Sequence, residues 1–112
     1  MDHQKLEKEL FNILNSFRIP QQFVGRKYII ESIYLLMDLN VYRGLTTEVY
    51  PRVAKKFNSS KPKVERSIRH AIEVAWESDG EIEREKIWGK RPTNSEFLYG
   101  ILNYLKYIEI VG

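Results

Sequence analysis

The 112-residue chain contains no cysteine and only two histidines, and these absences exclude several kinds of site. Without cysteine there are no disulfides, no thiolate chemistry and no Cys-based zinc site. No apolar run approaches the roughly 20 residues of a membrane span. The first residues, MDHQKLEKEL, lack the basic-then-apolar pattern of a signal peptide. We therefore expect a cytoplasmic protein with no membrane partner, no bound metal and no cofactor.

Recognisable catalytic motifs are absent as well. The sequence has no HExxH pair, no nucleophile elbow and no glycine-rich phosphate loop. Its glutamates are spread over expected helix faces, where solvation explains them. The chain is 43% hydrophobic, which is enough for one domain over residues 1–112 to bury a core without covalent staples. We expect a single domain that is not an enzyme.

Apolar residues recur at helical spacing along almost the whole chain, and no segment is typical of a strand. We expect helices at about 3–17, 25–40, 51–57, 61–77 and from 93 onward, with a short one near 82–88. Several residues are suited to N-capping these helices, namely Asp2, Thr46 or Thr47, Ser60, and Thr93 with Glu96 as a capping box. The pattern predicts an all-α fold, a compact bundle of about five to six helices.

Positive charge is concentrated in one segment. Between Tyr50 and His70 there are seven Lys or Arg residues and one acid, whereas the rest of the chain carries 11 basic and 14 acidic residues. Such a concentration on an otherwise mildly acidic domain is typical of a surface that binds a polyanion. A solvated charged face has the same composition, so charge alone leaves both interpretations open.

The same segment has the layout of a helix-turn-helix at about 51–77, with PRVAKKF, the turn NSS and then KPKVERSIRHAIEVAW. A helical projection of 61–77 gives one apolar stripe, made of Val64, Ile68, Ala71, Ile72 and Ala75. The basic residues gather toward the start of this helix, where its dipole disfavours cations that meet no anion. Recognition helices contact bases with this part. The pattern therefore predicts a helix that enters the major groove of DNA.

The candidate contacts divide into base readers and backbone contacts. Arg66 and Arg69 lie three residues apart, and arginine suits bidentate contact with guanine. Glu65 could accept from cytosine or could pair with Arg69 as an i, i+4 partner. The candidates for phosphate contact are Arg52, Lys55, Lys56, Ser60, Lys61, Lys63 and His70. For His70, a half-buried structural role is an equal alternative.

The words YPRVAKKFNSS, VERSIRHAIEVAW and KRPTNSEFL closely resemble the C-terminal DNA-binding domain of the sporulation master response regulator, the sporulation stage 0 protein A family. The similarity runs from about residue 11 to 106 and covers that effector domain without a receiver domain. It implies a six-helix domain that binds a box with a TGTCGAA-like core. It also implies that Glu65, Arg66 and Arg69 read the bases, with His70 at the backbone.

The resemblance adds two candidate partners to double-stranded DNA, namely RNA polymerase or its sigma factor, and a second copy of the chain on a tandem site. In the family these contacts lie near the region that corresponds to 76–92, which is shorter here. The alternative is a protein-interaction module of the same fold that binds polymerase, sigma factor or a full-length regulator instead of DNA. The aromatic side chains suited to anchor such a contact are Trp88, Tyr99, Tyr104 and Tyr107.

Overall fold

The computed structural model describes residues 2–39, 44–78 and 89–111, and the helix expected near 82–88, with Trp88, lies outside them. The elements are α1 (His3–Ser16), α2 (Val24–Leu39), the π-helical turn η1 (Leu45–Val49), α3 (Tyr50–Lys56), α4 (Lys61–Trp76) and α6 (Asn94–Val111). The described residues form helices and their connections, without a strand, which confirms the all-α prediction. The helices of the expected helix-turn-helix, α3 and α4, begin and end within one residue of the predicted bounds.

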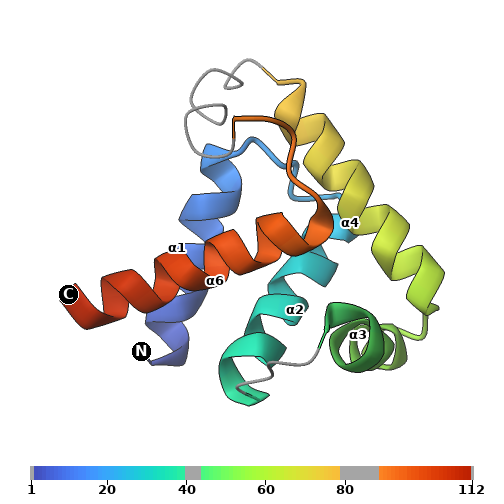
Figure 1. The fold of residues 1–112 in the computed structure, drawn as a ribbon, viewed down its shortest axis with the longest axis horizontal. Coiled ribbons are helices and arrows are strands. Elements are labelled where there is room, and N and C mark those ends of the chain that lie inside the picture. The colour runs from blue at the N-terminus through green and yellow to red at the C-terminus, as the bar shows by residue number, and fades with distance from the viewer. Residues whose placement is uncertain (1, 40–43, 79–88, 112) are drawn as a thin grey trace.

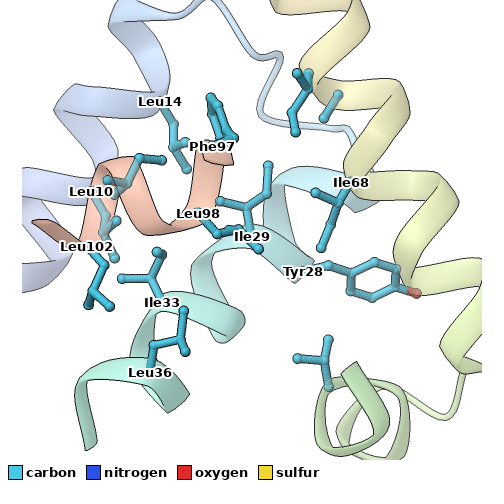
Figure 2. Packing of buried hydrophobic residues seen from close by; sticks show 14 of the residues in the cluster. Leu10, Leu14, Tyr28, Ile29, Ile33, Leu36, Ile68, Phe97, Leu98 and Leu102 are labelled. Carbon is cyan, nitrogen blue, oxygen red and sulfur yellow. The ribbon is translucent and has the colours of Figure 1, made fainter. Parts of the chain in front are cut away.

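The second helix lies in the middle of the arrangement (Figure 1). It contacts α3, α4 and α6, with α1 and α6 crossing on one side of it and α4 standing on the other. Leucine and isoleucine side chains from α1, α2 and α6 gather with an aromatic ring in one buried cluster, which includes Leu10, Leu14, Ile33 and Phe97 (Figure 2). This core therefore forms the support against which the helix-turn-helix packs.

The apolar stripe predicted for α4 is confirmed in full. The buried residues of this helix are Val64, Ile68, Ala71, Ile72 and Ala75. Their side chains face the core, whereas the basic residues between them point away from it. At roughly 25 cal/mol per Å² of buried apolar surface, such a stripe stabilises the helix on the domain far more than its own propensity does.

The second and fourth helices approach each other closely at Gly25. A Cβ atom added to Gly25 would lie 2.1 Å from the carbonyl oxygen of Ser67 and 3.1 Å from the Cβ atom of Ala71. Because the nearest of these atoms belongs to the α4 backbone, no side chain fits at this position of α2. The absence of a side chain on Gly25 therefore sets the distance between the two helices.

Three of the expected N-caps are present. A first-turn N–H donates to Asp2 Oδ1 at 2.9 Å, and another donates to Ser60 Oγ at 3.3 Å. At the start of α6, the Glu96 N–H donates to Thr93 Oγ1 and the Thr93 N–H donates to Glu96 Oε1, both at 3.1 Å. These bonds to Thr93 lower the pKa of the Glu96 carboxyl group. The capping box predicted from the sequence is therefore complete.

The expectation that Thr46 or Thr47 caps α3 is wrong. The chain is already helical from Leu45, and η1 continues directly into α3 without a side-chain cap. The N–H groups that a cap would satisfy find carbonyl groups of the preceding turn, as when the Tyr50 N–H donates to the Leu45 carbonyl. Thr47 Oγ1 instead lies 3.4 Å from the Gly44 carbonyl oxygen.

The turn between α3 and α4 is closed by backbone bonds. Asn58 has a φ of 51°, a left-handed conformation that asparagine tolerates better than most residues. The Ser59 N–H donates to the Ala54 carbonyl at 2.8 Å and the Asn58 N–H donates to the Lys55 carbonyl at 3.3 Å. This is the Schellman pattern, which ends α3 sharply and leaves four residues between α3 and α4.

Candidate nucleic-acid interface

The outer face of α4 carries the expected base readers. Arg66 and Arg69 are exposed, and Glu65 is half-buried at the edge of the buried stripe. Residues three apart on a helix lie about 5–6 Å from each other at their Cβ atoms, so the two guanidinium groups can reach neighbouring base steps. Among the described residues, neither arginine has a carboxylate within ion-pair distance. As far as the described residues go, both guanidinium groups are therefore available to an external anion or base.

The carboxylate of Glu65 does not form the i, i+4 ion pair with Arg69 that the spacing allows, within the described part of the chain. Both side chains instead line one open pocket between α4 and α6. The residues that line this α4–α6 pocket are Thr46, Tyr50, Glu65, Arg69, Arg91, Pro92, Thr93, Asn94 and Ser95. The structure therefore brings the expected base readers next to the segment that precedes α6.

The three candidates at the start of α4 lie together. Ser60, the N-cap residue, is exposed, as is Lys63, while Lys61 is half-buried. Cations at a helix N-terminus are disfavoured by the helix dipole unless an anion is near. A phosphate group at this end of α4 would meet the two ammonium groups together with a hydroxyl group.

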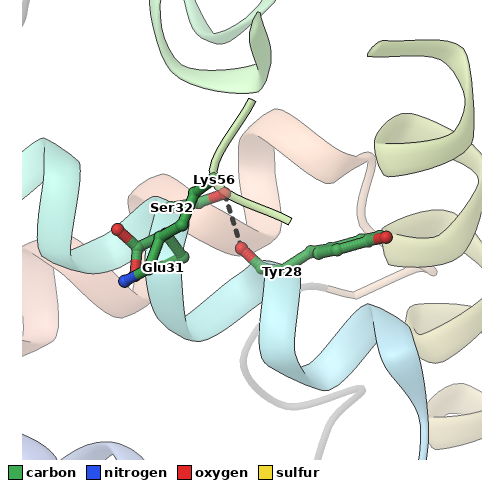
Figure 3. Close-up of polar contacts among 4 residues, drawn as sticks. All are labelled: Tyr28, Glu31, Ser32 and Lys56. Carbon is green, nitrogen blue, oxygen red and sulfur yellow. Dashed lines mark hydrogen bonds and ion pairs between the residues drawn. The ribbon is translucent and has the colours of Figure 1, made fainter. Parts of the chain in front are cut away.

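The basic residues of α3 differ in how far they are engaged inside the protein. Lys56 Nζ lies 2.7 Å from Glu31 Oε2 of α2, in a contact that joins the two helices (Figure 3). Arg52 lies 3.8 Å from Glu48, which is a long contact between side chains that both touch solvent. Lys55 is exposed and has no ion-pair partner among the described residues. Lys55 is therefore the least committed of the three candidates for phosphate contact.

His70 is exposed, so the half-buried position considered for it is wrong. Its ring stacks on the ring of Phe23, with centroids 5.4 Å apart and planes 13° apart. Phe23 directly precedes α2, so the stack holds the imidazole at the side of α4 near Arg66. Both rings line a second open pocket together with Gln22, Val24, Gly25, Arg66 and Ser67. His70 can therefore donate to a phosphate group while keeping a packing role.

Sequence reasoning missed two residues beside the base readers. Arg91 Nη1 lies 3.9 Å from Glu73 Oε1 of α4, which places the segment before α6 along that helix. Asn94 Nδ2 donates to the backbone carbonyl of Glu65 at 3.0 Å. The sequence does show two basic residues at 90–91, just before the capping box. Because this segment is far from α4 along the chain, no local pattern indicates that it lies beside that helix.

Tyr50 closes the inner side of the α4–α6 pocket. Burial raises the pKa of Tyr50 to about 12, and its contact with the Asn94 side chain opposes that rise. The neutral phenol is therefore the form present under ordinary conditions. This leaves Arg69 and Arg91 as the cationic side chains that line the pocket and Glu65 as its acidic one.

Residues 2–39, 44–78 and 89–111 offer neither a metal cluster nor a membrane span. No group of three His, Asp or Glu side chains in these ranges could hold a metal ion. None of the helices described there is long and apolar enough to cross a membrane.

Comparison with known families gives one match over most of the chain. The family model described as "Sporulation initiation factor Spo0A C terminal" matches residues 10–105. The matched range contains both helices of the helix-turn-helix, the α4–α6 pocket and every candidate base reader. This family is the DNA-binding domain of Spo0A, so the finding supports double-stranded DNA as the partner and transcription regulation in sporulation as the role.

Proposed function

The chain belongs to the family of the Spo0A C-terminal domain, and on this premise we propose that α4 reads the major groove of a box with a TGTCGAA-like core. The observation that supports this most is the division of α4 into two faces. One face is buried along its length, and the other presents Arg66 and Arg69 without internal partners among the described residues. If this face contacted only solvent, there would be no physical reason for two arginines without described ion-pair partners at the position where recognition helices contact bases.

We assign a distinct role to each reader. Arg66 and Arg69 donate to the O6 and N7 atoms of guanine, for which the planar guanidinium group has the right geometry. Glu65 accepts from the N4 amino group of cytosine. The remaining candidates fix the register on the duplex by phosphate contact, from α3 through Arg52, Lys55 and Lys56, and from α4 through Ser60, Lys61, Lys63 and His70.

Substitution of the two arginines tests this assignment. We expect Arg66→Ala and Arg69→Ala each to lose about 1–3 kcal/mol on a duplex with the box, because a bidentate contact to guanine is lost. On a scrambled duplex we expect little change. Fluorescence anisotropy with both duplexes measures the two affinities. Equal losses on both duplexes would show that the arginines contact phosphates only.

Lys55→Ala provides the matched control, because Lys55 is exposed on α3 and away from the proposed base contacts. We expect it to weaken binding to both duplexes alike and to reduce the slope of log K against log salt by about one. Glu65→Gln tests the third reader. An unchanged ranking of box variants in that protein would remove Glu65 from the base-reading set.

A second candidate function is a contact between α6 and RNA polymerase, its sigma factor or a full-length regulator. The observation that favours it is the exposure of two aromatic side chains on α6, Tyr104 at 49% and Tyr107 at 61%. Tyr99 is half-buried against the core and is a weaker candidate. Absence of binding to the box duplex at low salt would favour this function over DNA binding.

The two proposed protein contacts have their own readouts. If α6 contacts polymerase, Tyr107→Ser should weaken capture of purified polymerase and leave the affinity for the box duplex unchanged. If two copies bind side by side, a duplex with two tandem boxes should be bound cooperatively, whereas a single box should not.

A further inference from the structure

The amide of Asn94 contacts the backbone of α4 at the residue that carries one of the proposed base readers. Asn94 Nδ2 donates to the carbonyl oxygen of Glu65 at 3.0 Å, across 29 residues of sequence, in a half-buried position. A carbonyl oxygen has two lone pairs, and within an α-helix only one of them is used by the N–H four residues on. The bond from Asn94 is therefore added to the helical bonding of α4 without replacing any of it.

The end of α6 that carries Asn94 is itself held firmly. Thr93 and Glu96 form the reciprocal capping box on either side of it. Phe97 and Leu98, which follow directly, are 1% and 0% exposed. The Asn94 side chain thus extends from an anchored helix start, and its backbone has little freedom to follow a movement of α4.

Residues of three helices lie around this amide. Asn94 begins α6, its contact at Glu65 belongs to α4, and Tyr50 of α3 lines the same α4–α6 pocket. Glu65 and Arg69 line the same pocket, one helical turn apart on α4. A shift of α4 at this point would therefore move two of the proposed readers together.

The apolar packing of α4 supplies no directional bond. The hydrophobic effect that holds an apolar stripe on the core is itself non-directional. A hydrogen bond weakens steeply as its angle departs from linear. Base contacts require side chains to be held within about 0.5 Å and 10–20°. A directional hydrogen bond at Glu65 can hold α4 with this precision at a residue that is itself a proposed base reader.

We propose that Asn94 is a positioning residue for base recognition, which sets the rotation and axial position of α4 through its bond to the Glu65 carbonyl. The inference rests on the proposed function of α4 and adds a residue outside the helix-turn-helix to it. Asn94 need not touch DNA in this role. Its contribution is to the discrimination between the box and other sequences, and its effect on general DNA affinity is small.

Asn94→Ala tests the proposal, with Asn103→Ala as the matched control. Asn103 lies on the same helix, is exposed, does not line the α4–α6 pocket, and its side chain forms no hydrogen bond with another described residue. We expect Asn94→Ala to lower affinity for the box duplex about tenfold, with affinity for a scrambled duplex and the salt slope unchanged. In an Arg69→Ala background the same substitution should cost less, because the contact that it positions is already missing. Asn103→Ala should change neither affinity.

A purely structural role gives a different result. Asn94→Ala would then lower the midpoint of urea unfolding but leave the ratio of box to scrambled affinity as it is in the unchanged protein, and that outcome would overturn the inference. If Asn94→Ala does not fold, Asn94→Asp takes its place, since aspartate keeps the shape and suits a helix N-terminus but cannot donate to the carbonyl. Its added charge weakens binding to both duplexes, so the ratio remains the test.

Failure of the proposed function is distinguishable from failure of this inference. A chain that without substitution binds box and scrambled duplexes equally overturns the proposed function, and the inference with it. A chain that discriminates between them, and whose Asn94 variants discriminate equally well, overturns the inference alone.

Discussion

Two neighbours hold the proposed recognition helix α4 in two different ways. On one side α2 crosses it at Gly25, where backbone lies against backbone and no side chain fits between them. On the other side α6 donates a hydrogen bond to it, from the Asn94 amide to the Glu65 carbonyl. The first contact sets how far α4 stands from the core. The second is directional and acts on how the helix is turned.

We expect these two contacts of α4 to differ in effect: the packing at Gly25 should govern the stability of the domain, and the bond from Asn94 should govern its choice of DNA sequence. An extra atom inserted into a closely packed contact destabilises the folded state, because the atoms on either side must move apart to avoid overlap. A half-buried hydrogen bond contributes only about 1 kcal/mol to stability. Such a bond can still decide whether side chains meet their target with the correct geometry. Substitutions on the α2 side should therefore unfold the domain before they alter its choice of sequence.

Gly25→Ala should show the largest effect. Its Cβ atom would lie 2.1 Å from the Ser67 carbonyl oxygen, and because that oxygen belongs to the backbone the two helices must separate. We expect a loss of about 3 kcal/mol in the free energy of unfolding, at the upper end for overpacking. Urea unfolding followed by far-UV circular dichroism measures it. The folded fraction should still prefer the box.

Gly44→Ala is the control for the effect of glycine itself. No atom lies within 4 Å of a Cβ added there, and its φ is −41°, so alanine fits. We expect a change below about 0.5 kcal/mol. If Gly25→Ala were no more destabilising than this control, the close contact between α2 and α4 would not be a feature of the protein in solution.

High pH tests the burial of Tyr50, the α3 residue that lines the α4–α6 pocket. The pKa of Tyr50 is raised by burial to about 12, against about 10 for an unfolded chain. The folded state favours the neutral phenol, so this stability is complete below pH 10 and is lost as the pH rises to 12. Between a pKa of about 10 and one of about 12, at 1.36 kcal/mol for each pH unit, the loss is roughly 2.7 kcal/mol.

Tyr50→Phe is the comparison that isolates this effect. Unfolding midpoints at about pH 9 and pH 11.5 should fall further in the unchanged protein than in the variant, which has no phenol at that position. Burial also raises the pKa of Tyr34, but Tyr34 is present in both proteins and its contribution cancels. If the unfolding midpoint fell equally in both proteins, Tyr50 would be in contact with water, and the inner side of the α4–α6 pocket would be open to solvent.

The features that the sequence predicted correctly are those set within one helix. The buried stripe of α4 follows from the 3.6-residue period, and the caps at Asp2, Ser60 and Thr93 follow from hydrogen bonds that span three residues. Such interactions need no knowledge of the neighbouring helices. The outline of the fold and the face of α4 that carries the candidate readers could therefore be predicted from local patterns alone.

The features that it did not predict depend on contacts between helices. Gly25 reads as an ordinary helix start, and only the crossing with α4 shows why it carries no side chain. Asn94 lies 29 residues from Glu65, and Lys56 lies 25 residues from Glu31. No local pattern indicates that either pair meets. The roles assigned to the base readers remain predictions, since they depend on a duplex that the chain must meet in solution.

The ion pair between Lys56 and Glu31 should show the smallest effect. Lys56 is 56% exposed in its side chain and Glu31 is 13% exposed, so solvent screens the contact from the lysine side. A double-mutant cycle with Lys56→Gln and Glu31→Gln should give a coupling of about 0.5 kcal/mol, which decreases as salt is added. A coupling several times larger, or one that persists in high salt, would mean that the pair is shielded and fastens α3 to α2.

The same variants relate this pair to DNA binding. Glu31→Gln frees Lys56 for a phosphate group, so affinity for box and scrambled duplexes should rise together, by no more than about threefold. Lys55 has no ion-pair partner among the described residues. Lys55→Gln therefore only removes a phosphate contact and should lower both affinities together. A phosphate contact positions without specifying, so neither variant should change the ratio of the two affinities. A changed ratio in Glu31→Gln would mean that α2 also influences how α4 is turned, and the proposed division of roles between α2 and α6 would then be wrong.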